Sequence, residues 1–137
     1  MRYLGLDLGE KSLGVALSDK SGIIASFYKN IKFTDKNKMF FELQAILEQE
    51  KPDKIILGYP KNMDNSLGER VEKTLEFKKE LEKVYPKEII LEDERLTTRL
   101  ANQTLIKADI SRKKRKKVVD GIAAVIILQS YLDRKDR

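Results

Sequence analysis

Residues 2–19 read Arg-Tyr-Leu-Gly-Leu-Asp-Leu-Gly-Glu-Lys-Ser-Leu-Gly-Val-Ala-Leu-Ser-Asp, and this stretch decides the fold. Apolar residues recur at every second position, first at 4, 6 and 8 and then at 13, 15 and 17, which is the period of a β-strand. Residues 9–12, which include glycine, lysine and serine, form a turn between the two runs. The pattern predicts two paired strands at the start of the chain.

Asp7 does not fit a plain hairpin. A carboxylate inside an apolar strand is costly unless a cation or several hydrogen-bond donors compensate it. Gly5, Gly9 and Gly14 leave space beside it, so that another backbone or a charged ligand could approach closely. The alternative is that Asp7 ends an edge strand and faces water.

Length and composition bound the possible functions. A chain of 137 residues with 41% hydrophobic content suits one compact domain, residues 1–137, with its own core. The chain has no Cys and no His, which excludes thiol nucleophiles, thiolate zinc sites, Ser-His-Asp triads and His-ligated metals. Catalysis must then use carboxylates, Lys, Tyr, Ser, Thr or a hard metal ion. With no signal-peptide pattern at the N-terminus, we expect a cytoplasmic protein.

Positive charge is concentrated in one segment. The net charge is +6, and residues 107–117, with seven basic residues and one acidic residue, account for all of it. Such a segment is typical of a contact with a nucleic-acid phosphate backbone, although a solvated lysine-rich loop has the same composition. We expect the run to join two helices and to be mobile until nucleic acid binds it. The candidate substrate-binding residues in it are Arg112, Lys113, Lys114, Arg115, Lys116 and Lys117.

The rest of the chain alternates helical and strand patterns. Further strands are predicted at Ile23–Ile31, Asp53–Tyr59 and Glu88–Glu92, and helices at Lys38–Glu50, Ser66–Val84, Thr97 or Thr98 to about Ala108, and Val118–Leu132. Ser66 is the expected cap of the second helix. The order predicts an α/β fold with a five-stranded mixed sheet, in which a three-strand antiparallel meander is followed by two parallel strands, flanked by helices.

Acidic residues follow the sheet topology. Right-handed crossovers place the first, fourth and fifth strands side by side, so that their ends share one edge of the sheet. Asp7, the pair Asp93 and Glu94, and Asp120 near the start of the last helix can then converge. Carboxylates on a rigid frame suit Mg²⁺ or Mn²⁺, and two such ions could activate water and stabilise a departing oxygen in phosphodiester hydrolysis.

Four motifs in order along the chain resemble the YqgF/RuvX family. They are Gly-Leu-Asp-Leu-Gly-Glu-Lys-Ser-Leu-Gly-Val-Ala-Leu-Ser-Asp (5–19), Ile-Leu-Gly-Tyr-Pro-Lys-Asn-Met-Asp (56–64), Asp-Glu-Arg-Leu-Thr-Thr (93–98) and Val-Asp-Gly-Ile-Ala-Ala-Val-Ile-Ile-Leu (119–128). The resemblance implies an RNase H-like fold and a nuclease that trims the 5′ end of pre-16S ribosomal RNA in the bacterial cytoplasm. An older assignment of the family is Holliday junction resolvase.

The resemblance also implies site residues. It makes Asp7, Glu94 and Asp120 the catalytic and metal-binding carboxylates. Asp93 is the alternative to Glu94, because adjacent strand residues face opposite sides and the continuous apolar run of the fifth strand does not show which side each residue faces. Arg95, which follows the acid, and Arg99, four residues further along the predicted helix, are expected to contact phosphate. Their alternative role is an internal salt bridge.

Other positions depart from the family pattern. Glu10 adds negative charge near the metals, and Tyr59 and Asn65 replace a usual Leu and Gly.

Partners follow from the same reading. We expect nucleic acid, structured RNA in preference to branched DNA, together with ribosomal precursor particles, no membrane, and a monomer or weak homodimer. Two other functions fit parts of the sequence. Asp-x-Gly with a glycine-containing hairpin also begins the ATP-binding modules of actin-like proteins and sugar kinases, but no second phosphate loop follows. A nucleic-acid-binding protein without catalysis is the other alternative.

Overall fold

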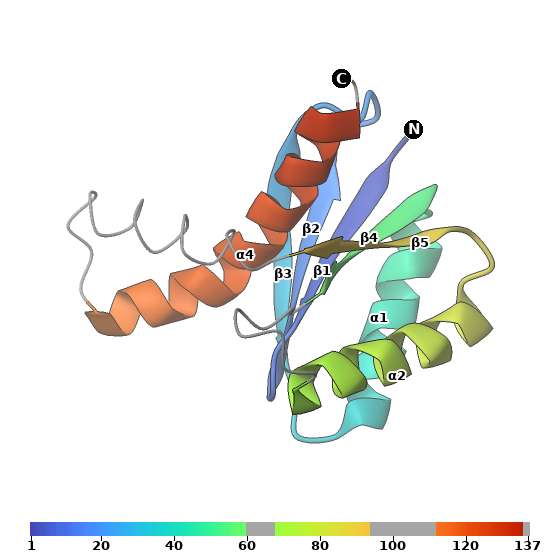
Figure 1. Cartoon of the computed structure of the whole chain (residues 1–137). Coiled ribbons are helices and arrows are strands. Elements are labelled where there is room, and N and C mark those ends of the chain that lie inside the picture. The colour runs from blue at the N-terminus through green and yellow to red at the C-terminus, as the bar shows by residue number, and fades with distance from the viewer. Residues whose placement is uncertain (60–67, 94–111, 136–137) are drawn as a thin grey trace.

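The computed structural model describes residues 1–59, 68–93 and 112–135, and for 112–121 it gives the course of the helix alone. The chain forms five strands and three helices within these ranges (Figure 1). The strands are β1 (Tyr3–Leu8), β2 (Ser12–Ser18), β3 (Ala25–Lys32), β4 (Lys54–Tyr59) and β5 (Ile89–Asp93). The helices are α1 (Lys36–Glu50), α2 (Glu69–Val84) and α4 (Arg112–Lys135).

The sheet has the order β3-β2-β1-β4-β5. β1 pairs antiparallel with β2 and parallel with β4, while β2–β3 is antiparallel and β4–β5 is parallel. The predicted mixed sheet is therefore confirmed. β1 lies at its centre, so the alternative in which Asp7 ends an edge strand is wrong. Helices α1 and α2 cover one face, and α4 covers the other (Figure 1).

Alternation along β1 sends its side chains to two separate cores. Leu4 and Leu6 are fully buried on the face covered by α1 and α2, in one cluster with Phe77 of α2. Tyr3 belongs to the second cluster, which includes Leu128 of α4. Each buried leucine stabilises the fold by roughly 1.5–3 kcal/mol, so β1 is held from both sides.

Glycine allows α4 to lie directly on β1. A Cβ atom on Gly5 would be 2.8 Å from Cβ of Leu128 and 3.0 Å from the carbonyl oxygen of Ala124. Tyr3, two residues earlier in β1, lies with its ring centroid 5.8 Å from that of Tyr131. Because positions along β1 increase while the contacted positions along α4 decrease, α4 runs antiparallel to β1.

Side-chain contacts tie α4 to other strands. The amide of Gln129 donates to the carbonyl of Ile23, and its oxygen accepts from the backbone N–H of Ala25, each at 2.9 Å. At the other edge of the sheet, Arg134 donates two hydrogen bonds to the carboxylate of Glu92 on β5, the first at 2.6 Å. The helix is thus joined by hydrogen bonds to both edge strands, β3 and β5.

All three described helices begin at other residues than predicted, and α1 begins at Lys36 instead of Lys38. α2 begins at Glu69 with Gly68 as its N-cap and without a side-chain cap, instead of at Ser66. α4 begins at Arg112 instead of Val118, so the basic run 112–117 is the start of a helix and not a joining segment. Lys and Arg have high helix propensity, and like-charge repulsion at helical spacing costs only a few tenths of a kcal/mol per pair. The helix predicted from Thr97 or Thr98 lies outside the described residues.

None of the helices in the described part of the chain is long and apolar enough to cross a membrane.

Replacing Gly5 by Ala should lower the free energy of unfolding by about 1–3 kcal/mol, because the added methyl group overlaps Leu128 and the α4 backbone. Chemical denaturation of the purified variant measures this. In the double variant Gly5→Ala/Leu128→Gly, the loss should be smaller than the sum of the two single losses, because the second change removes the Cβ atom of Leu128 that the new methyl group overlaps. Additive losses would show that α4 does not rest on Gly5.

Replacing Arg134 by Gln should cost about 1–2 kcal/mol of stability, because Glu92 is only 4% exposed and would keep a charge without its strongest partner. The matched control is Lys83→Gln, which removes a pair with Glu80 between two exposed side chains. That control should change stability by less than about 0.5 kcal/mol. Equal effects in the two variants would contradict the buried role of Glu92.

Candidate active site at the carboxyl ends of the central strands

Asp7 lies near the carboxyl end of β1, on the face covered by α4. Side chains alternate along a strand, so Asp7 shares the side of Tyr3 and Gly5, both of which contact α4. The residue is half-buried. A carboxylate is therefore held at the middle of the sheet, beneath the helix.

The two strands that flank Asp7 carry glycine beside it. On β2, Gly14 is its direct partner. On β4, the register Leu6 to Leu57 places Gly58 one step further along, at the level of Asp7. Both glycines are buried and have no side chain. The residues that flank Asp7 on the two neighbouring strands therefore contribute backbone alone.

The glycines named in the sequence have different roles. Gly5 accommodates α4, as described above. Gly9 forms the β1–β2 turn, in which its N–H donates to the carbonyl of Ser12 at 2.8 Å. Gly14 lies directly beside Asp7 on the neighbouring strand β2.

The pairing of β5 with β4 shows which side chains of β5 face α4, which the sequence alone does not indicate. Glu92 pairs with Gly58 and is bound by Arg134, so it lies on the α4 face. Asp93 pairs with Tyr59 and lies on the opposite face, because adjacent strand residues point to opposite sides. Asp93 and Asp7 thus lie on different faces of the sheet. Glu94 is outside the described residues.

The Glu92–Arg134 pair was not anticipated. The hydrogen bond from Arg134 to the Glu92 carboxylate raises the pKa of Arg134 above its usual value. The two residues are 42 positions apart, and Arg134 stands in a C-terminal run of mixed charge, so no local pattern indicates the contact. The pair holds the end of β5 against α4.

Asp120 belongs to the part of α4 that approaches Asp7. α4 contacts Gly5 through Ala124, and Asp120 precedes Ala124 by one helical turn. One turn of four residues advances about 6 Å along the helix, and the two residues from Gly5 to Asp7 advance about 6.6 Å along the strand. Because α4 runs antiparallel to β1, position 120 lies on the side of Ala124 that is toward the carboxyl end of β1. The side chain of Asp120 lies outside what the structure describes.

The remaining candidates are distributed as follows. Arg112, Lys113, Lys114, Arg115, Lys116 and Lys117 form the first turns of α4, ahead of Asp120. Arg95 and Arg99, like Asn65, lie outside the described residues. Within residues 1–59, 68–93 and 112–135, no group of three acidic side chains that could hold a metal ion is formed. Of the three predicted carboxylates, Asp7 is thus the one whose side chain lies in the described part of the chain.

Comparisons with known proteins identify the family. The family model described as "RuvX: Holliday junction resolvase" matches residues 1–134. A protein of Bacillus pumilus is 50% identical over 135 residues, which is 97% of this chain and 98% of that protein. A protein of Clostridium tetani is 50% identical over 133 residues, 97% and 96% of the two chains. Both carry the name "Putative pre-16S rRNA nuclease".

Solved structures show the same fold. The RuvC structure of Thermus thermophilus superposes with a TM-score of 0.58 at 13% identity, covering 99% of this chain and 97% of that one. The Fowlpox virus resolvase in its complex with Holliday junction DNA gives a TM-score of 0.59 at 16% identity and covers both chains fully. The expected RNase H-like fold is confirmed, and with the match over residues 1–134, the chain belongs to the RuvX family.

Proposed function

We propose that this protein is a divalent-metal-dependent nuclease that processes the 5′ end of pre-16S ribosomal RNA. The RuvX family match and the nuclease names of relatives that share half of their residues with this chain support the enzyme class. The observation that carries the proposed site is the position of Asp7 on the α4 face near the carboxyl end of β1, toward which α4 extends from Ala124 back to Asp120. We place the reaction in the bacterial cytoplasm, where ribosomal precursors are made.

The carboxylates fit a hard cation. Asp7, Glu94 and Asp120 would hold Mg²⁺ or Mn²⁺, which prefer oxygen ligands, and the chain offers no His or Cys to a softer metal. Asp93 lies on the face opposite to Asp7, which favours Glu94 as the ligand from this pair. When bound, such ions supply activation of water and neutralise charge on the phosphate.

The protein residues around Asp7 position the substrate. Gly14 and Gly58 leave no side chain beside the carboxylate, so a phosphate group could approach it. Glu92 is held by Arg134, which keeps this second acid engaged within the protein. Arg95, Arg99 and the basic start of α4, residues 112–117, would neutralise neighbouring phosphates of the same strand.

Cleavage of branched DNA is the second candidate. The description of the family model, Holliday junction resolvase, specifically favours it. Parallel assays with pre-16S leader RNA and with a four-way DNA junction separate the two. Cleavage of the RNA with no cleavage of the junction supports our proposal, and the reverse result supports resolvase activity.

Asp7→Asn should abolish Mg²⁺-dependent cleavage, a loss of at least about 1,000-fold, because an amide does not replace the charge of a metal ligand. Thermal stability should be unchanged or raised, since a partly buried negative charge is removed. Glu94→Gln and Asp120→Asn should lose activity in the same way. The matched control is Asp93→Asn, which changes an adjacent carboxylate on the other face and should remain active. A fully active Asp7→Asn enzyme, or an inactive Asp93→Asn enzyme, would contradict the assignment.

Changing Lys113, Lys114 and Lys116 to Ala should weaken binding to every RNA sequence alike and make it less sensitive to salt. Alanine preserves the helix, so the change removes charge alone. For three lost phosphate contacts, the log-log slope against salt should become shallower by about 2 on single strands. Turnover at saturating substrate should survive, because none of the three is a proposed metal ligand.

A triple variant in α2 controls for net charge. Lys78, Lys79 and Lys83 lie on α2, away from the α4 face, and their replacement by Ala removes the same charge. This variant should keep the original salt slope. If both triple variants have equal slopes, the start of α4 does not contact the substrate.

A further inference from the structure

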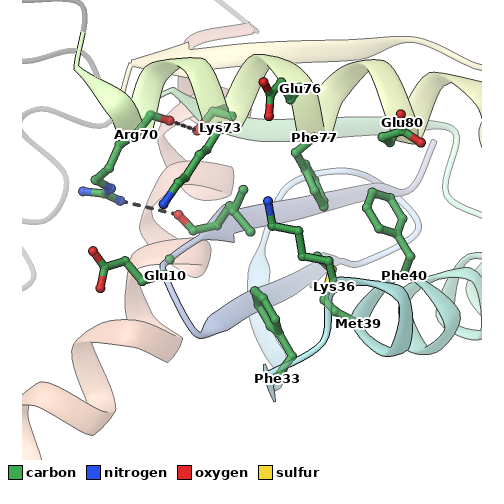
Figure 2. A pocket seen from close by; sticks show the side chains of 13 residues that line it. Glu10, Phe33, Lys36, Met39, Phe40, Arg70, Lys73, Glu76, Phe77 and Glu80 are labelled. Atoms are coloured by element: carbon green, nitrogen blue, oxygen red, sulfur yellow. Dashed lines mark hydrogen bonds between the residues drawn. The ribbon is translucent and has the colours of Figure 1, made fainter.

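A cavity of about 250 Å³ lies on the face of the sheet opposite to Asp7. It is bounded by the start of α1, the first half of α2 and the end of β1, and Figure 2 shows its lining. Asp7, the one proposed metal ligand whose side chain the structure describes, does not line it. The cavity thus lies apart from this carboxylate.

Aromatic rings form much of its wall. Phe40 of α1 and Phe77 of α2 lie with their centroids 5.1 Å apart, and Phe33, which precedes α1, stands below them in Figure 2. Phe77 is buried, whereas Phe33 and Phe40 are only half-buried and keep ring surface accessible. Flat rings of this kind are the surfaces on which proteins stack nucleobases.

Three cations line the cavity. Lys36 and Lys73 extend into it from opposite helices, and Arg70 lies at the end away from Phe40, where it donates to the carbonyl of Leu8 at 3.5 Å (Figure 2). Lys73 also pairs with Glu69 at 3.5 Å, but that pair is solvent-exposed and therefore weak.

Lys36 stands in an unfavourable local position. It is the first residue of α1, whose first turn holds no acidic residue, and a cation there opposes the helix dipole. Within the described part of the chain, it forms no ion pair. Its ammonium group is exposed, beside the N-cap Asp35, and is available to an anion.

Acidic residues restrict how a ligand can lie. Glu80 lies at the Phe40 end of the cavity, and Glu10 and Glu76 also belong to the lining (Figure 2). The cavity therefore has no net positive field that would hold any polyanion. A ligand that fits must place its anionic group between Lys36 and Lys73 and an uncharged, flat group against the phenylalanines.

The cavity adjoins the proposed active site through the β1–β2 turn. Leu8, Gly9 and Glu10 line it and follow Asp7 directly in the chain. Asp7 and Gly9 are two residues apart, which corresponds to about 7 Å along a strand. A nucleic-acid strand that crosses the end of β1 would reach both faces of the sheet within a short distance.

From these observations we propose that the cavity binds one unpaired nucleotide of a single-stranded segment of the substrate. Its base stacks against Phe33 and Phe40, and its phosphate lies between Lys36 and Lys73. The inference rests on the proposed nuclease function and deepens it, because it requires a single-stranded stretch beside the cleaved bond. A fully paired duplex cannot place a base in this cavity.

The test uses the full chain carrying Asp7→Asn, so that binding is measured without cleavage. Adenosine 5′-monophosphate is titrated in an NMR experiment, and ribose 5-phosphate, which lacks the base, is titrated in parallel. The nucleotide should shift the amide signals of Phe40, Lys73 and Phe77, and ribose 5-phosphate should bind about tenfold more weakly. Signals from the α4 face should move less than those of the cavity.

Two variants assign the contacts. Lys36→Gln should weaken binding of the nucleotide about fivefold, whereas Lys38→Gln, an exposed lysine in the same turn that does not line the cavity, should have no effect. Phe33→Leu should weaken the nucleotide without weakening ribose 5-phosphate.

Three results would overturn the inference: equal affinity for the two probes, shifts confined to the α4 face, or no shift at millimolar nucleotide. None of these depends on catalysis, so failure here is distinguishable from failure of the nuclease assignment, which the cleavage assays measure.

Discussion

The distance between strand β1 and helix α4 depends on the missing side chain at Gly5. With Leu128 and the Ala124 carbonyl in contact with this residue, the helix rests on the strand backbone and cannot slide without exposing its apolar face. α4 runs antiparallel to β1, so the helical turn before Ala124 lies toward the carboxyl end of β1, where Asp7 stands. The proposed metal site is in this sense a consequence of helix packing, because one carboxylate comes from the strand and another from the helix.

The two faces of the sheet differ in the side chains that they carry. On the α1–α2 face, Leu4, Leu6 and Leu57 are fully buried and make the central strands rigid. On the α4 face, glycines flank Asp7 on the neighbouring strands, with Gly14 near the amino end of β2 and Gly58 near the carboxyl end of β4. The Glu92–Arg134 pair binds β5 to α4 at the edge. A rigid core on one side thus supports the strand that carries Asp7 on the other.

Much of this arrangement follows from the sequence. The alternation around Leu4 and Leu6 predicts β1, and right-handed crossovers predict the order of the strands, because both depend on local pattern and general chirality. Features that depend on tertiary contact were not predictable. The side on which Asp93 lies follows from the pairing of β5 with β4, and the Glu92–Arg134 contact joins residues far apart in the chain. The start of α4 at Arg112 was missed because a run of charge was interpreted as a linker, although Lys and Arg favour helix.

The most direct test of the central claim is the location of a bound divalent ion in solution. Mn²⁺ added in substoichiometric amounts broadens NMR signals of nearby amides, most strongly for the closest ones. We expect Gly14 and Gly58, which flank Asp7, to broaden first, before Phe40 and Phe77 on the opposite face, and we expect Asp7→Asn to remove the effect. Earlier broadening on the α1–α2 face, or broadening that persists unchanged in Asp7→Asn, would show that the ion does not bind beside Asp7.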